Sequence, residues 1–160
     1  MNTQQNFAVN DYDKRNKLLL GSDAPVILDL FAYYKDNPRT PLTLWDEKVN
    51  NITPPDISNK PNIIRGNVLE PVVRNILIPI FHPDIEVVED LNTYYSPDND
   101  FMACHIDGQV VGKKRLAEIK CPAFGPMTNW KFNGEYHIPD YVRAQCLHIL
   151  ACRPDIEGID

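Results

Sequence analysis

The chain has 160 residues, a length typical of one domain. Apolar residues make up 43% of it, but no apolar run approaches the roughly 18 residues of a membrane-spanning helix, so the sequence predicts no membrane contact. Lys and Arg number 16 and Asp and Glu 22, and the net charge of −6 argues against a protein that holds nucleic acid through bulk positive charge. We expect a single domain over residues 1–160, with residues 1–10 as a flexible leader. Because the leader lacks the basic and apolar regions of a secretion signal, we expect a cytoplasmic protein.

Two short helices are predicted near the start of the chain. The first begins at Ser22-Asp23-Ala24-Pro25, a helix-start signal, and its apolar residues carry it to about Tyr34. Thr40 is suited to cap a second helix that runs through Lys48. The stretch 50–61 contains three prolines and no periodicity, which predicts a loop.

A longer helix is predicted from Gly66-Asn67 onward. Apolar residues recur there at intervals of three and four, the period of a helix with one buried face. We expect Pro71 in its first turns and its end before Pro79, because proline interrupts a helix interior.

The second half of the chain alternates strand and helix signals. Ile85–Val88 predicts a short strand, and residues 101–111 and 116–121 predict two strands joined by a turn at Gly112-Lys113. A last helix is predicted from about Pro139-Asp140. Helices followed by strands and a further helix indicate an α/β or α+β protein.

The predicted hairpin carries a pair of carboxylates. With the turn centred between Gly112 and Lys113, antiparallel pairing joins residues whose numbers sum to 225, so Asp107 faces Glu118. Side-chain alternation places Lys120 on the side of Glu118. Two carboxylates directly opposite one another repel unless a cation lies between them.

A divalent metal would remove this repulsion, and oxygen ligands suit Mg²⁺ or Mn²⁺. With Lys120 placed to orient or deprotonate an attacking water, such a site fits phosphodiester hydrolysis. The alternative is structural. In that interpretation Glu118 and Lys120 form an exposed ion pair at the edge of the hairpin and Asp107 lies at a turn.

An ordered set of motifs extends this interpretation. In chain order they are Gly21-Ser22-Asp23, Thr40-Pro41 to Trp45 with Lys48, Gly66-Asn67-Val68-Leu69-Glu70-Pro71, Asp107-Gly108, Glu118-Ile119-Lys120 and Tyr141 to Gln145. From about Asp11 to Cys152 the chain resembles the YqaJ-type viral recombinases, phage nucleases similar to the lambda-type alkaline exonuclease within the PD-(D/E)xK superfamily. The resemblance implies an α/β restriction-endonuclease-like core, with a mixed central sheet flanked by helices. Family chains continue past the last helix into another core strand, whereas this one stops at Asp160, so we expect a core that is truncated at its C-terminal end or a partial chain.

The resemblance implies roles for the residues of the hairpin and of the helix before it. Glu70, Asp107 and Glu118 are similar to the family's metal-binding carboxylates, and the Ile119 carbonyl corresponds to a further ligand. Lys120 resembles the catalytic lysine. The set implies Mg²⁺ as the cofactor, with Mn²⁺ able to substitute.

Three further site residues follow from the resemblance. Gln145 matches the glutamine of a later helix beside the active site, and Arg15 and Ser22 match the pair that binds a DNA 5′ phosphate. Structural alternatives stay open for three of the site residues: a capping box with Asn67 for Glu70, a helix N-cap for Ser22, and a plain polar helix position for Gln145.

The function implied by the resemblance is a Mg²⁺-dependent exonuclease. It would hydrolyse double-stranded DNA from 5′ to 3′ and generate single strand for recombination. Expected partners are double-stranded DNA ends, a phage single-strand annealing protein and further copies of the chain, in the host cytoplasm if the protein is phage-encoded. The alternatives are an endonuclease or repair nuclease of the same superfamily, and a catalytically inactive DNA-binding or assembly module.

Overall fold

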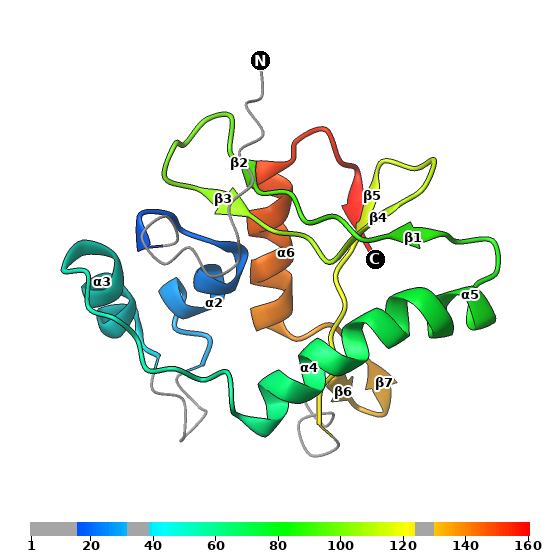
Figure 1. The fold of residues 1–160 in the computed structure, drawn as a ribbon, viewed down its shortest axis with the longest axis horizontal. Helices are drawn as coiled ribbons and strands as arrows, with labels where there is room; N and C mark the ends of the chain where they lie inside the picture. Colours follow the sequence, from blue (N-terminus) through cyan, green and yellow to red (C-terminus); the bar gives the residue numbers. More distant parts are fainter. Residues whose placement is uncertain (1–15, 32–38, 124–129) are drawn as a thin grey trace. The chain divides into compact units, whose positions relative to one another are not determined.

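The computed structural model describes residues 16–31, 39–123 and 130–160 (Figure 1). The chain divides into two compact units, each built from separate stretches of sequence. Unit 1 comprises Met1–Pro54, Leu91–His105 and Asp140–Pro154, and unit 2 comprises Pro55–Asp90, Ile106–Pro139 and Asp155–Asp160. The expected leader, residues 1–10, lies outside the described residues, and the single domain stays a prediction.

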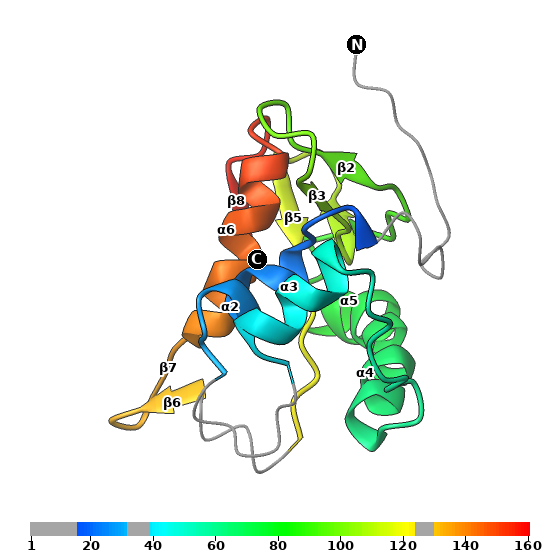
Figure 2. The ribbon, with the colours of Figure 1, turned by 90° about the vertical axis from the view of Figure 1, so that its left-hand side faces the viewer.

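Unit 1 is mainly helical. Its elements are η1 (Gly21–Asp23, a 3₁₀ turn), α2 (Ala24–Ile27), α3 (Pro41–Val49), α6 (Asp140–Cys152) and the antiparallel pair β2 (Tyr94–Tyr95) and β3 (Ala103–Cys104). Helix α6 contacts η1, α2 and β3, and α2 also contacts α3 (Figure 2). Leu18, Leu20 and Ala103 form a buried apolar cluster with Tyr95 packed against it.

The first helix is shorter than the sequence predicts. Helix α2 ends at Ile27, because Asp29 has a φ of 52°, in the left-handed region that an α-helix does not contain. The Asp29 N–H bonds the carbonyl of Val26, which closes a turn in place of a further helical turn. Tyr34, the predicted end, lies outside the described residues.

The other two helices of unit 1 begin where the sequence predicts. The Thr40 hydroxyl accepts the N–H of Thr43 at 3.2 Å, which caps α3. Helix α6 begins at Asp140, whose carboxylate suits the positive end of a helix dipole.

Unit 2 contains a mixed four-stranded sheet in the order β1-β4-β5-β8. The strands are β1 (Val87–Val88), β4 (Gly108–Val110), β5 (Arg115–Ala117) and β8 (Gly158–Ile159). Strands β1, β4 and β5 pair antiparallel, and β8 runs parallel to β5. A separate hairpin pairs β6 (Lys131–Phe132) with β7 (Glu135–Tyr136). The mixed sheet confirms the predicted sheet type.

The predicted hairpin register is confirmed. Gly108 pairs with Ala117 and Gln109 with Leu116, so the numbers of each pair sum to 225 as expected. Gly112 has a φ of 71°, which glycine adopts at the turn without steric cost. The single strand predicted over 101–111 is wrong, because β3 pairs with β2 while β4 pairs with β1 and β5.

A strand also follows α6. Strand β8 pairs with β5, and the Asp160 N–H donates to the carbonyl of Leu116 at 2.9 Å while the Asp160 carbonyl accepts the N–H of Glu118 at 3.0 Å. A strand that joins the sheet thus follows the last helix, while a core truncated at its C-terminal end or a partial chain stays a prediction.

The long helix begins earlier and ends later than the sequence predicts. Helix α4 (Pro61–Val72), the π-helical turn η2 (Val73–Leu77) and α5 (Ile78–Phe81) follow one another directly, beside β1 (Figure 1). Pro61 lies in the first turn of α4, where its missing N–H is tolerated, while Pro71 lies inside the helix. In the wide turn the Ile78 N–H bonds the carbonyl five residues back, and the chain then passes Pro79 in helical conformation.

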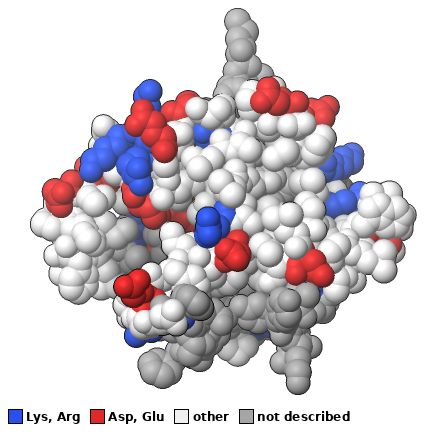
Figure 3. Space-filling view, turned by 180° about the vertical axis from the view of Figure 1, so that it is seen from behind, with Lys and Arg blue, Asp and Glu red and all other residues white. Residues whose placement is uncertain are grey.

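Charged side chains of both signs are mixed on the surface. Among the described residues on the face drawn in Figure 3, Lys and Arg lie next to Asp and Glu and form no continuous basic area. No helix within the described ranges is long and apolar enough to cross a lipid bilayer.

Candidate active site

Asp107 and Glu118 flank the hairpin of unit 2. Asp107 directly precedes β4 and Glu118 directly follows β5, so the two extend the confirmed register by one position. Asp107 Oδ2 accepts the N–H of Ile119 at 2.7 Å, which fixes the carboxylate against the backbone of the opposite segment. The Glu118 side chain is only 4% exposed.

The pKa of Asp107 is raised from 3.8 to about 7. Burial is the largest cause, and the carboxylates of Glu118 and Glu70 also raise the pKa, while the Ile119 N–H and Lys120 lower it. The carboxylates of Glu118 and Glu70 are thus each close enough to Asp107 to disfavour its charge. The site has an excess of negative charge.

Lys120 lies on the side of Glu118, as the alternation predicts. Its ammonium forms an ion pair with Glu118 Oε1. The alternative of an exposed ion pair at the edge is wrong for Glu118, because a side chain that is 4% exposed is not at the surface.

Glu70 lies in the interior of α4. Asn67 is itself inside this helix, so the capping-box alternative for Glu70 is wrong. Glu70 Oε1 accepts a hydrogen bond at 2.9 Å from Arg74, one helical turn later.

Two arginines of this region, Arg74 and Arg65, were not predicted from the sequence. Arg74 is buried and contacts Glu70, Glu89 and the Asp107 carbonyl. Its spacing of four residues from Glu70 is the signal that could have found the first contact. Arg65 of α4 donates to the Cys121 carbonyl at 3.2 Å, which ties the helix to the segment after Lys120.

The site offers the type of ligand that Mg²⁺ prefers, namely carboxylate and carbonyl oxygens. They are the carboxylates of Glu70, Asp107 and Glu118, with the Ile119 carbonyl as the predicted fourth. In the described part of the chain, no three His, Cys, Asp or Glu side chains are yet arranged to hold a metal ion. Glu70 is engaged by Arg74, Glu118 by Lys120 and Asp107 by a backbone N–H, so these side chains would have to shift toward a shared ion.

The predicted phosphate-binding residues lie in or before η1 of unit 1. Ser22 is exposed in this turn, but Asp23 Oδ2 accepts the N–H of Leu20 at 3.0 Å, so Ser22 is not the capping residue. Arg15 lies outside the described residues. The phosphate-binding role of both residues stays a prediction.

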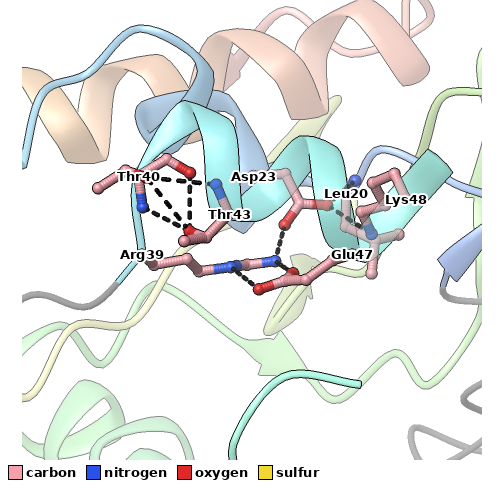
Figure 4. Close-up of polar contacts among 7 residues, drawn as sticks. All are labelled: Leu20, Asp23, Arg39, Thr40, Thr43, Glu47 and Lys48. Atoms are coloured by element: carbon pink, nitrogen blue, oxygen red, sulfur yellow. Dashed lines mark hydrogen bonds and ion pairs between the residues drawn. The ribbon is translucent and has the colours of Figure 1, made fainter. Parts of the chain in front are cut away.

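Asp23 joins η1 to α3 through a buried ion network (Figure 4). Its carboxylate pairs with Arg39 Nη2 at 2.8 Å and with Lys48 Nζ at 3.1 Å, and Arg39 also pairs with Glu47 at 2.7 Å. Asp23 and Glu47 are 2% and 6% exposed. The network fixes the turn that carries Ser22 against the second predicted helix.

The substitution Asp23→Ala is expected to destabilise the protein. It leaves the Leu20 N–H and two cations without their shared acceptor, and the loss in free energy of unfolding should be about 2–3 kcal/mol, reduced from the fully buried case because Arg39 is partly exposed. Urea titration measures it. Asp56→Ala is the control, because Asp56 is an exposed loop residue, and it should leave the unfolding midpoint near wild type. Equal midpoints for both variants would contradict the prediction.

Gln145 lies on α6 of unit 1 and is half-buried. A Cβ atom on Gly21 would lie 3.3 Å from Gln145 Cγ, so α6 approaches η1 closely at the residue before Ser22. Gln145 and Ser22 thus belong to neighbouring elements of one unit, while the carboxylates belong to unit 2. A position of Gln145 beside the carboxylates stays a prediction.

The chain is similar to one protein family in sequence and to solved exonuclease structures in fold. A family model described as the YqaJ-like viral recombinase domain matches residues 12–153, and no curated protein matches. Among solved structures, an alkaline exonuclease (LHK-Exo) from Laribacter hongkongensis is similar with a TM-score of 0.59 at 17% identity, over 89% of this chain and 67% of that one. LHK-Exo in complex with dAMP gives 0.58 at 19%, with the same coverage. These similarities confirm the predicted PD-(D/E)xK fold.

Proposed function

The chain belongs to the YqaJ-like viral recombinase family, and on this basis we propose that it is an exonuclease that hydrolyses double-stranded DNA with the help of Mg²⁺. We propose a 5′-to-3′ direction and the generation of single strand for recombination. The observation that carries the proposal is that Glu70 and Glu118 act on the buried Asp107 carboxylate, whose pKa is raised mainly by burial and further by these two neighbours. An excess of carboxylates around one point is what a divalent cation neutralises.

Each residue of the site then has a role. Glu70, Asp107, Glu118 and the Ile119 carbonyl would hold Mg²⁺, with Mn²⁺ able to replace it. Bound there, the metal would stabilise negative charge on the phosphate oxygens and on the leaving oxygen. The Lys120 ammonium, held by Glu118, would orient the attacking water and balance the negative charge that develops on it as its proton passes to solvent.

The charge distribution supports a metal-dependent attraction to DNA. The net charge is −6, and the face in Figure 3 carries mixed charges among its described residues. Bulk positive charge therefore does not supply the attraction. Two Mg²⁺ ions at the carboxylates would add positive charge where the phosphate must lie.

Digestion of linear duplex DNA by the purified protein tests the proposal. Hydrolysis should require Mg²⁺ or Mn²⁺, stop on chelation, and spare covalently closed circles. Cleavage of closed circles at the rate of linear duplex would favour an endonuclease or repair nuclease. Duplex binding without hydrolysis in either metal would favour a catalytically inactive DNA-binding or assembly module.

A preference for phosphorylated ends is expected if Arg15 and Ser22 bind the 5′ phosphate. Linear duplex with 5′ phosphates should be degraded about tenfold faster than duplex with 5′ hydroxyls, because a charge-assisted contact contributes on the order of 1.5 kcal/mol or more. The double variant Arg15→Ala with Ser22→Ala should lose this preference. Ser58→Ala, at an exposed loop serine of unit 2, should keep it. Equal rates on both ends for the wild type would contradict this assignment alone.

Partners and location belong to the same proposal. Family membership supports a phage single-strand annealing protein and further copies of the chain as partners, in the cytoplasm of a bacterial host. Size measurement of the purified protein, alone and mixed with a candidate annealing protein, tests both partners.

A further inference from the structure

Arg74 connects three separate parts of unit 2 from the wide turn η2. Its side chain is 3% exposed. Nη1 donates to Glu70 Oε1 and to the Asp107 carbonyl, both at 2.9 Å, and Nη2 pairs with Glu89 just after β1. One guanidinium thus contacts the helix, the residue after the edge strand and the residue that precedes β4.

The contacts of Arg74 require a glycine at position 108. A Cβ atom on Gly108 would lie 2.5 Å from Val87 Cγ1, 3.0 Å from the Val88 carbonyl and 3.6 Å from Arg74 Cδ. The first distance is shorter than real Cβ contacts allow, so Gly108 permits β1 and Arg74 to approach β4. The close approach brings the guanidinium to the Asp107 carbonyl.

The contacts of Arg74 depend on the fixed directions of its hydrogen bonds and not on its charge alone. Its Nε is buried without a hydrogen-bond partner in the described structure, so this arginine forgoes one bond while both terminal nitrogens are placed on their partners. Lysine could not reproduce the arrangement, because a single ammonium lacks the planar fork that reaches Glu70 and Glu89 in fixed directions.

We propose that Arg74 is a positioning residue of the metal site, an inference that rests on the proposed function. It binds the Glu70 carboxylate through Oε1 and fixes the main chain at Asp107, and so holds two of the three carboxylates at the site, from which their side chains shift toward the ion. Groups that orient metal ligands in this way typically change metal affinity or activity by about 10–100-fold when they are removed.

Three variants test the role of Arg74. Arg74→Gln removes the charge and the fork, and Arg74→Lys keeps the charge alone. Glu89→Gln is the matched control. It removes the ion pair of Arg74 Nη2 with Glu89, and it leaves the contacts of Nη1 with Glu70 and Asp107 in place. For each full-length variant, the Mg²⁺ concentration at half-maximal effect is measured twice, from the rise in melting temperature without DNA and from the cleavage rate.

Both Arg74 variants should need about 10–100-fold more Mg²⁺ at half-effect, with the KM for DNA unchanged and kcat reduced at fixed Mg²⁺. Glu89→Gln should stay within about threefold of wild type in Mg²⁺ requirement. A purely structural arginine would lower the melting temperature and leave the Mg²⁺ requirement as it is.

The outcomes separate the two proposals. A wild-type response to Mg²⁺ with an unchanged requirement in either folded Arg74 variant would overturn the positioning role and leave the proposed function intact. Failure of both Arg74 variants to fold, with Glu89→Gln folded, would assign Arg74 a structural role and also overturn the inference. Absence of any Mg²⁺ response in the wild type, by melting and by cleavage, would overturn the proposed function itself.

Discussion

DNA hydrolysis should fall by a factor of about 10³ or more in Glu118→Gln and in Lys120→Met, because in the proposed mechanism Glu118 would hold the metal and Lys120 would orient the attacking water. Glu118 would lose a metal-binding oxygen, and Lys120 the ammonium that orients the attacking water. The two side chains form an ion pair that is largely shielded from solvent, so Gln and Met, which keep the side-chain volume, are preferred to alanine. Single-turnover cleavage of linear duplex measures the loss.

The same sheet offers a matched control. Lys114 and Glu157 form an ion pair at 3.7 Å with both side chains more than 70% exposed. Lys114→Met and Glu157→Gln should therefore keep nearly full activity, because exposed pairs contribute little. Near-normal hydrolysis by Glu118→Gln or Lys120→Met, with far-UV circular dichroism unchanged, would remove these residues from the mechanism.

Asp107→Asn is expected to stabilise the protein in the absence of metal. The pKa of Asp107 rises from 3.8 to about 7 on folding, mainly through burial and then Glu118, so the ionised carboxylate is disfavoured in the folded state. Asparagine carries no charge and can still accept the Ile119 N–H. At about pH 8 the gain should be on the order of 2 kcal/mol, about half of what the full pKa shift would give.

The sign of the pH dependence follows from the same shift. The unfolded chain releases the Asp107 proton near pH 3.8, while the folded protein retains it up to about pH 7. Wild-type stability from this group therefore falls as the pH rises through that window, and the advantage of Asp107→Asn grows with it.

Added metal should narrow the difference in stability between the two proteins. Millimolar Mg²⁺ or Mn²⁺ should raise the wild-type melting temperature by about 3–6 °C if its concentration exceeds the dissociation constant about tenfold, since only the folded state binds it. Asp107→Asn should lose most of this rise. Asp84→Asn, at an exposed aspartate of the same unit, should respond as wild type. A melting temperature indifferent to metal and to Asp107→Asn would show that the carboxylates do not share a site.

The hairpin was predictable because its geometry is local. A turn centred between Gly112 and Lys113 fixes every pair on both sides, and the observed pairing of Gly108 with Ala117 follows from it. The same arithmetic placed Asp107 and Glu118 together. The position of Lys120 on the side of Glu118 followed from side-chain alternation alone.

The bounds of the long helix were predicted wrongly because a proline can begin a helix, lie inside it or interrupt it. Pro61 begins a helix, Pro71 lies inside it and Pro79 follows a wide turn, and only contacts with the rest of unit 2 decide between these cases. Arg74 was missed for a similar reason. Its contacts with Glu89 and the Asp107 carbonyl span 15 and 33 residues, beyond what any local pattern encodes.

Strand β8, which pairs with one edge of β5, comes from a distant part of the sequence. During synthesis on the ribosome it is therefore made well after β5. The Asp160 carbonyl that accepts the Glu118 N–H is made about 40 residues after Glu118, a delay of roughly 2–8 s at typical translation rates. Until then the outer edge of β5 presents unpaired N–H and C=O groups beside a repelling set of carboxylates. A nascent chain paused in this interval would expose a strand edge open to pairing with a neighbouring chain on the same messenger RNA.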